Sequence, residues 1–285
     1  MANVIQIRNL PNPAALYARI ASTLLKKGKG SLPDIKIQYD NQIIQPSDLK
    51  KYNKVCGFEH TLIVPSTFIH TRAFELQALL LTHPACPFPY PGLIVFANTI
   101  KQTRSLYVGE EFNLSCSFGN LIAHEKGQGF NLDLRILRDD EVVWSATQSL
   151  LRVGVAQKSG KPYASPITDE AALSRQADFN AASDLGRRYG AVSGDRNPIH
   201  LTAMSAKLFG FRRAIAHGMW TKARALSCLL PAQQLEQASV AVDFKTPLFL
   251  PSRASLWSAR KPDGALFEVR DAKGQRPHLR GQLQY

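Results

Sequence analysis

The chain has 285 residues and a hydrophobic content of 45%, enough to bury one large core or two medium ones. It contains no apolar run of about 18 residues, so we expect no transmembrane helix. The N-terminus, MANVIQIRNLPNP, lacks the basic, apolar and small-residue order of a signal peptide. These features predict a cytoplasmic protein. No CxxC spacing occurs, so the cysteines are expected to be reduced and mostly buried: Cys56, Cys86, Cys116 and Cys228.

The net charge of +13 is compatible with three explanations. A basic surface can attract nucleic acid or the phosphates of a coenzyme A thioester, or it can serve only to keep the protein soluble. The basic residues are spread along the chain, without a repeated aromatic–basic pattern or a basic helix. We therefore expect no nucleic-acid partner, although the charge alone does not choose among the three.

The first predicted element is a helix from about Asn12 to Lys27. Apolar residues recur at helical spacing, Asn12 can cap the helix, and Pro13 suits its first position. This pattern is typical of a helix that docks on the outside of a fold. A helix lying on a membrane surface is the less favoured alternative.

A sequence frame of the form Y-x-x-V-small-G-x then occurs twice, at 52–58 and at 189–195. A second pair of similar segments, 103–109 and 245–251, follows in the same order, each before a strand-like run. Two matching motifs in one order predict two copies of one domain. We place the copies at 1–153 and 166–285, joined by a polar linker rich in Gly and Lys at 154–165.

In the first copy, Arg72 to Thr82 is an apolar helical run, and a proline-rich segment follows it. Leu93 to Ile100 is helix or strand by pattern alone. Three runs with strand patterns complete the copy: Phe112–Phe118, Gly129–Arg138 and Glu141–Arg152.

The second copy begins with a polar segment, Asp169 to Ser183, which we predict to be partly helical. Ser183 or Asp184 can cap a short helix, Ala203 to Leu208 forms another, and an apolar helix runs from Gly218 through Leu230. Four strands with two turns between them are predicted last: Ser239–Phe244, Ala254–Ser258, Leu266–Arg270 and Leu279–Gln284.

The most informative stretch is YGAVSGDRNPIH at 189–200, which contains an acid, an amide and an imidazole. Gly194 permits a left-handed backbone just before Asp195, and Pro198 keeps Asn197 out of the helical region. This is a turn that aims side chains. Asp195 and His200 can hold a water and move protons near neutral pH. A plain turn with a surface histidine is the alternative.

A second motif, Ala216-His217-Gly218-Met219-Trp220, opens the apolar helix. Glycine at a helix start exposes backbone N–H groups, and the positive end of the helix dipole favours developing negative charge. An acid/base pair followed by a helix that begins at glycine suits a site that forms an enolate.

Together, Y-x-A-V-S-G-D-x-N-P-I-H and A-H-G-M resemble the signature of the MaoC-like hydratase/dehydratase family, the R-specific enoyl-CoA hydratases. The resemblance implies an α+β double hot-dog fold, in which each module wraps an antiparallel sheet around a central helix. It implies reversible hydration of trans-2-enoyl thioesters to (R)-3-hydroxyacyl thioesters, with Asp195 and His200 as the catalytic pair and Gly218 as the oxyanion donor. It also makes the segment from Leu93 the counterpart of the helix after Gly218.

Four further residues are assigned to substrate binding: Ser193, Asn197, His217 and Phe244. His217 could be another acid or base, but support of the turn is favoured. The segment Asp243-Phe244-Lys245-Thr246-Pro247 resembles the family's F-x-x-P segment, which implies that Phe244 lines the acyl or pantetheine tunnel; a plain core position is the alternative. Basic residues that could meet coenzyme A phosphates are Arg188, Arg212, Arg213, Lys222 and Arg224. The histidines at 60, 70, 83, 124 and 278 show no metal-ligand spacing, and no nucleotide-binding motif occurs. We therefore expect no metal and no cofactor, with coenzyme A only as part of the substrate.

Because the first copy has Phe58 at the position of the acid and no N-P-x-H after it, we expect it to be catalytically inactive. The substrate carrier can be coenzyme A or acyl carrier protein, since a basic surface suits both. A hot-dog thioesterase, and a non-enzymatic protein that binds acyl-CoA or nucleic acid, are the remaining alternatives. A monomer and a homodimer are both compatible with two modules in one chain.

Overall fold

The structure is a computed structural model that describes residues 3–26, 28, 30–59, 62–230 and 236–285. The chain forms two compact units that interleave along the sequence. The first unit comprises Met1–Ile43, Arg72–Asn98 and Glu111–Ala164, and the second comprises Ile44–Thr71, Thr99–Glu110 and Ser165–Tyr285. The second unit thus takes two segments from the first half of the sequence. Our division into modules at 1–153 and 166–285 describes the repeat along the chain and stays a prediction.

The first unit is a curved sheet beside one buried helix, α4 (Phe74–Thr82). The helix is apolar on almost all sides, because six of its nine residues are buried, and it packs against β2 and β4. The sheet order is β1-β2-β4-β5-β6-β3, and the short β7 (Lys161–Pro162) pairs with β4. Its strands are β1 (Asn3–Ile7), β2 (Ile35–Ile43), β4 (Glu111–His124), β5 (Gly127–Arg138), β6 (Glu141–Val153) and β3 (Leu93–Gln102).

The N-terminal helix α1 (Pro13–Ser22) confirms the predicted capping. The Asn12 side-chain oxygen accepts a hydrogen bond from the Ala15 N–H at 2.8 Å, and Pro13 occupies the first turn. The helix continues into a 3₁₀ turn, η1 (Thr23–Leu25), and Lys27 lies outside the described residues. The buried residues Leu16 and Ile20 face the fold and α1 packs on α4, so α1 is the docking helix that the pattern predicts.

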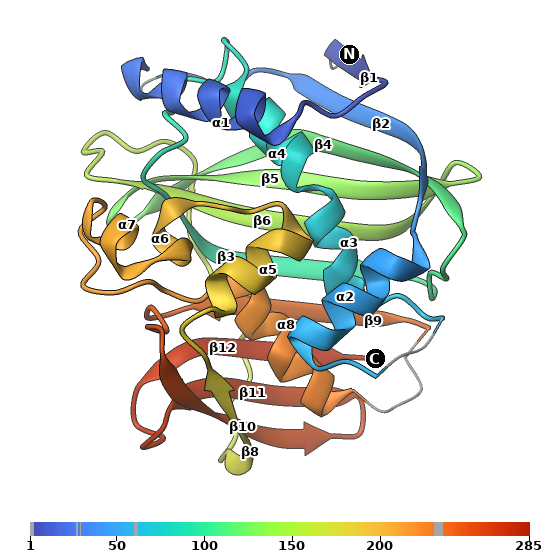
Figure 1. Cartoon of the computed structure of the whole chain (residues 1–285), viewed down its shortest axis with the longest axis vertical. Helices are drawn as coiled ribbons and strands as arrows, with labels where there is room; N and C mark the ends of the chain where they lie inside the picture. The colour runs from blue at the N-terminus through green and yellow to red at the C-terminus, as the bar shows by residue number, and fades with distance from the viewer. Residues whose placement is uncertain (1–2, 27, 29, 60–61, 231–235) are drawn as a thin grey trace. The chain divides into compact units, whose positions relative to one another are not determined.

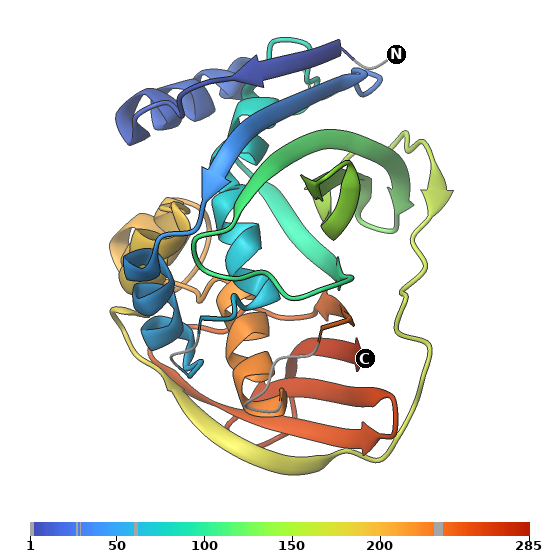
Figure 2. The ribbon, with the colours of Figure 1, turned by 90° about the vertical axis from the view of Figure 1, so that its right-hand side faces the viewer.

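The second unit repeats this plan around helix α8 (Gly218–Leu229). Its sheet has the order β9-β12-β11-β10-β8, and every adjacent pair is antiparallel. Figure 2 shows these strands curving around α8, which packs against β11 and β12. The four strands that the sequence predicts here are confirmed, each longer than predicted and β10 twice as long: β9 (Ala238–Phe244), β10 (Ser252–Lys261), β11 (Gly264–Asp271) and β12 (Pro277–Gln284).

The repeated Y-x-x-V-small-G frame has a shared backbone structure. Both copies form the last turns of a helix, α2 (Pro46–Cys56) and α5 (Leu185–Ser193), and each helix ends at a left-handed glycine. Gly57 has φ 82° and Gly194 has φ 78°, values that only glycine adopts without strain. The rings of Tyr52 and Tyr189 lie 6.3 Å apart where α2 packs on α5. The repeat therefore reflects two equivalent helix ends within the second unit.

Two predictions for individual segments are wrong. Leu93–Ile100 belongs to strand β3 and is not the counterpart of the α8 helix; α4, which follows α3 (Ser66–Arg72), is the central helix of the first unit. Within Asp169–Ser183, the regular element is strand β8 (Ser174–Ala181) instead of a helix. Among the described strands β8 pairs with β10 alone, and most of its residues are exposed, so its polar sequence is that of an edge strand.

In the described part of the chain, no helix has the length and apolarity needed to cross a bilayer. The four cysteines are free thiols; three are buried and Cys228 is half-buried. The thiols are therefore placed as the sequence predicts.

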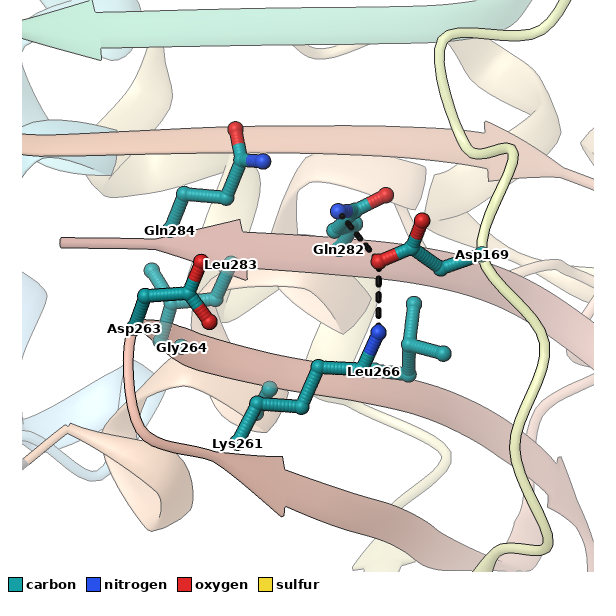
Figure 3. A pocket seen from close by; sticks show the side chains of 9 residues that line it. Asp169, Lys261, Asp263, Gly264, Leu266, Gln282, Leu283 and Gln284 are labelled. Atoms are coloured by element: carbon teal, nitrogen blue, oxygen red, sulfur yellow. Dashed lines mark hydrogen bonds and ion pairs between the residues drawn. The ribbon is translucent and has the colours of Figure 1, made fainter.

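A segment that precedes β8 crosses the open face of the second sheet, where Asp169 fastens it (Figure 3). The Asp169 carboxylate accepts hydrogen bonds from Lys261 Nζ at 2.6 Å and from the Gln282 amide at 3.2 Å. Arg280 donates to the Asp169 main-chain oxygen at 2.8 Å. Leu173 packs on a small cluster formed by Ile167, Ala241 and Leu266.

We expect Asp169→Ala to lower the free energy of unfolding by about 1 kcal/mol, because both partners are partly exposed and a screened ion pair contributes little. Denaturant unfolding measures the change, and Asp169→Asn, which can keep one hydrogen bond, should lose less. A loss equal to that of Asp178→Ala, a carboxylate in an exposed pair with Arg175, would contradict a role in fastening the segment.

Candidate active site

The turn after α5 is held by hydrogen bonds to its own backbone. The Asn197 N–H donates to the Asp195 carboxylate at 3.1 Å, and the Asn197 side-chain oxygen accepts from the Ile199 N–H at 3.3 Å, capping the short helix α6 (Pro198–Leu201). The Ser193 hydroxyl accepts from the Asp195 N–H at 3.3 Å. The side-chain oxygens of Asn197 and Ser193 therefore stabilise the turn by accepting backbone hydrogen bonds. The Asp195 side chain is 31% exposed, so solvent or a ligand reaches its carboxylate.

His200 is held by α6 with one ring nitrogen committed. Its Nδ1 lies 2.8 Å from the main-chain oxygen of Ile215, and since a carbonyl can only accept, Nδ1 carries the proton. In the neutral ring the lone pair is then on Nε2, which is the basic atom. His200 is buried, and nitrogens of His200 and His217 and an oxygen of Asp195 lie within 4.8 Å of one another. The predicted pair Asp195 and His200 is thus brought together.

His217 contacts both members of this pair. Its Nε2 lies 2.9 Å from the Asp195 main-chain oxygen, to which it donates, and its ring stacks on His200 with a centroid distance of 3.7 Å. The ring of Tyr189 lies 4.9 Å from His217 on α5. His217 is 3% exposed. Its contacts are those of a support that positions the turn.

Burial keeps both imidazoles neutral. Desolvation lowers the pKa of His200 below its usual value, although the nearby Asp195 charge and the hydrogen bond to Ile215 oppose this change. Burial, helped by the neighbouring His200, lowers the pKa of His217 to about 3. Near pH 7 the site therefore contains two uncharged rings, and His200 can accept a proton.

Gly218 is the first residue of α8, and His217 is its N-cap. A Cβ atom at Gly218 would lie 2.8 Å from Cε1 of Phe244, so the ring of Phe244 packs directly against this glycine. The first backbone N–H groups of a helix have no partner inside it, and the dipole makes this end positive. Because His217 and Gly218 are adjacent in the chain, the helix start lies beside the Asp195 and His200 pair.

The three polar side chains resemble a metal-ligand set by proximity alone. However, His200 Nδ1 and His217 Nε2 already donate to main-chain oxygens. The remaining nitrogens are on stacked rings inclined by only 25°, so their lone pairs lie in nearly parallel planes, an arrangement that does not suit two ligands of one metal ion. The geometry disfavours a metal centre, and the expectation of no metal stays a prediction.

The basic residues near the site in sequence have different surroundings. Lys222 is fully buried and donates to the Val240 oxygen at 3.1 Å, so the prediction that it could meet a phosphate is wrong. Arg224 lies over the ring of Phe179, and Arg188 pairs with Asp184. Arg212 and Arg213 both lie over the ring of Phe249.

Sequence reasoning missed the Ile215 carbonyl, which decides the tautomer of His200. It also missed the stack of His217 on His200. No sequence signal could have revealed the carbonyl, since any residue supplies one. No sequence signal indicates the stack either, since the two histidines are 17 residues apart.

A helix wrapped by an antiparallel sheet defines the class of hot-dog proteins, and this chain contains that arrangement twice. Solved structures of that class superpose on this chain. The structure of HtdX from Mycobacterium tuberculosis matches with a TM-score of 0.76 at 28% identity, covering 87% of this chain and 98% of that one. A MaoC-like dehydratase from Phytophthora capsici matches with a TM-score of 0.75 at 16% identity, covering 90% and 95%, which shows the fold alone.

The chain belongs to the MaoC-like dehydratase family. It is 30% identical over 248 residues to 3-hydroxyacyl-thioester dehydratase X of Mycobacterium tuberculosis, spanning 87% of this chain and 88% of the relative. The family model described as "MaoC like domain" matches residues 162–265. The resemblance inferred from the motifs and the predicted α+β hot-dog class are thereby confirmed. Membership in this family supports dehydratase activity.

Proposed function

We propose that the protein reversibly hydrates trans-2-enoyl thioesters to (R)-3-hydroxyacyl thioesters at the Asp195 and His200 pair. The observation that carries the proposal is the clustering of these side chains within 4.8 Å, beside the start of α8. The relative's name, 3-hydroxyacyl-thioester dehydratase, agrees with the dehydration direction.

The two side chains are complementary acceptors for one water molecule. Water has two hydrogens, and the Asp195 carboxylate and the Nε2 lone pair of His200 can each accept one. A water held in this way presents its own lone pair to C3 of the enoyl group. As the C3–O bond forms, one acceptor takes a proton from the water and the C2–C3 double-bond electrons move to the thioester oxygen.

The resulting enolate is stabilised at the helix start. The Gly218 N–H donates to the enolate oxygen, and the positive end of α8 adds to this effect. A proton then passes to C2 on the same face, which completes the addition of water and restores the pair. Dehydration reverses each step.

The remaining residues assigned to the site support this chemistry. Ser193 and Asn197 hold the turn that carries Asp195, and His217 fixes its main chain. Phe244 covers Gly218 and leaves no space for a side chain there. This contact supports a role for Phe244 in bordering the thioester end of the substrate.

The pH dependence of hydration follows from the state of His200. Since burial lowers its pKa, the neutral basic form persists below pH 6.5, and kcat/KM should fall only at more acidic pH. In Asp195→Asn the acid limb of the residual activity should shift to still lower pH, because the Asp195 charge, which raises the His200 pKa, has been removed. A pH–rate profile from pH 4.5 to 8 measures both. An acid limb centred above pH 7 in the wild type would contradict this assignment.

The direct test is hydration of short and long trans-2-enoyl-CoA thioesters by the purified protein, with product chirality determined by chromatography. We expect (R)-3-hydroxyacyl-CoA. Release of free thiol would identify a thioesterase instead, and the (S) product would contradict the proposed face of addition. No turnover of either coenzyme A or carrier-protein thioesters would overturn the proposal.

A further inference from the structure

The segment 196–213 joins Asp195 to the residues that bind His200, and its composition is unusual. It contains the four basic residues Arg196, Lys207, Arg212 and Arg213 and no Asp or Glu. It includes α6 and the short helix α7 (Ala203–Lys207), and a tight turn follows in which Phe209 and Phe211 both donate to the Ala206 oxygen. The segment therefore has a net positive charge and no acidic side chain, and it adjoins the active site.

Three large apolar side chains of this segment are exposed. Met204 is 79% exposed, Leu208 is 84% exposed and Phe209 is 46% exposed. All three lie within six residues of one another, with Lys207 between them and Arg212 just beyond. Single exposed apolar residues need no explanation, but three of them in one short basic segment are typical of an interaction surface. We call Met204, Lys207, Leu208, Phe209 and Arg212 the α7 patch.

We propose that the α7 patch docks an acidic helical carrier protein that presents the enoyl thioester on a flexible arm. This inference rests on the proposed function, because that site requires a thioester carrier. A nucleotide carrier would need cations but would leave Met204 and Leu208 without a role. A protein helix with acidic and apolar side chains complements both components of the patch.

The surroundings of the patch favour a protein over a membrane surface. Helix α7 has only five residues and no long apolar stripe, whereas helices that lie in membranes are longer amphipathic elements. The segment is also anchored, since Ser205 donates to the Pro198 oxygen at 2.7 Å and Arg187 donates to the Leu201 oxygen at 3.2 Å. Helix α7 begins two residues after the end of α6, which carries His200, so docking on this anchored surface would hold the arm close to the site.

The test compares two substrates in one pair of variants. The double variant Lys207→Glu/Leu208→Asp alters exposed side chains only, so folding should be unchanged. The matched control is Lys273→Glu/Leu62→Asp, which makes the same charge changes at a turn and at a residue that is 72% exposed. Each protein is assayed with the same trans-2-enoyl group on coenzyme A and on purified acyl carrier protein.

We expect Lys207→Glu/Leu208→Asp to lower kcat/KM for the carrier-protein thioester at least tenfold while coenzyme A turnover stays within twofold. The control should change neither. Calorimetry measures binding of the carrier protein with its arm but no acyl group. The double variant should weaken this binding, and added salt should weaken it in the wild type. This binding is measured without catalysis, so it separates failure of the patch from failure of the proposed reaction.

Three results would overturn the inference. Equal losses on both substrates would mean that the variant disturbs the site and that the patch is not a docking surface. Carrier-protein turnover unaffected by the double variant would place docking elsewhere. Binding to vesicles of anionic phospholipid that the double variant abolishes, with carrier turnover unchanged, would make the α7 patch a membrane contact.

Discussion

Asp195→Asn and His200→Ala should each lower enoyl-thioester hydration by about a hundredfold or more, because each removes one of the two acceptors that hold the water. Asn is isosteric with Asp and can still accept the Asn197 N–H, so the turn should survive in Asp195→Asn. His200→Ala removes the basic Nε2 and leaves the Ile215 oxygen without its donor. Stopped-time assays of product formation under saturating and limiting substrate separate kcat from KM.

The losses should not add. If both side chains act on one water, the double variant Asp195→Asn/His200→Ala should have nearly the same activity as the less active of the two single variants. Asp184→Asn is the matched control, since it makes the same chemical change at an exposed carboxylate that pairs with Arg188 on α5. It should retain activity within about twofold. Wild-type rates in both Asp195→Asn and His200→Ala would refute the site.

The second large effect is expected at Gly218, where a substitution can delete the oxyanion donor and keep the helix. Proline is favoured at the first position of a helix and has no N–H. His217, with φ −63° and ψ 134°, already has the conformation that a residue before proline adopts. Gly218→Pro should therefore leave α8 folded and lower kcat by about a hundredfold or more.

Steric contact with Phe244 must be separated from loss of the donor. Gly218→Ala keeps the N–H but places Cβ 2.8 Å from the Phe244 ring, so it should lose activity through displacement of the ring. Adding Phe244→Leu should restore most of the activity of Gly218→Ala and little of that of Gly218→Pro. Equal rescue of the two variants would show that the ring contact, and no hydrogen bond from Gly218, is what the reaction requires.

The proposed site was predictable to an unusual degree because it is coded locally. The acid, the amide and His200 lie within six residues, and the left-handed Gly194 and the proline give the turn its shape without distant contacts. The same holds for the Gly218 helix start and for the cap of α1. Local backbone preferences decide such features, and a single sequence contains them.

Features that depend on distant partners were predicted poorly. Leu93–Ile100 is an apolar run that suits helix and strand equally, and only its place in the first sheet makes it a strand. The polar β8 is a strand because β10 offers it an edge to pair with. In both cases the pattern of side chains is ambiguous, and hydrogen bonding to a strand far along the chain decides the outcome.

By itself, the sequence determined the family, the hot-dog class and the residue types of the proposed site, since each depends on residue types at fixed short spacings. Only the tertiary structure decided the state of that site. It places the Ile215 carbonyl against His200, stacks His217 on the same ring and closes Phe244 over Gly218. Tautomer, pKa and steric fit arise from burial among residues that are distant in sequence, and these depend on how the chain packs.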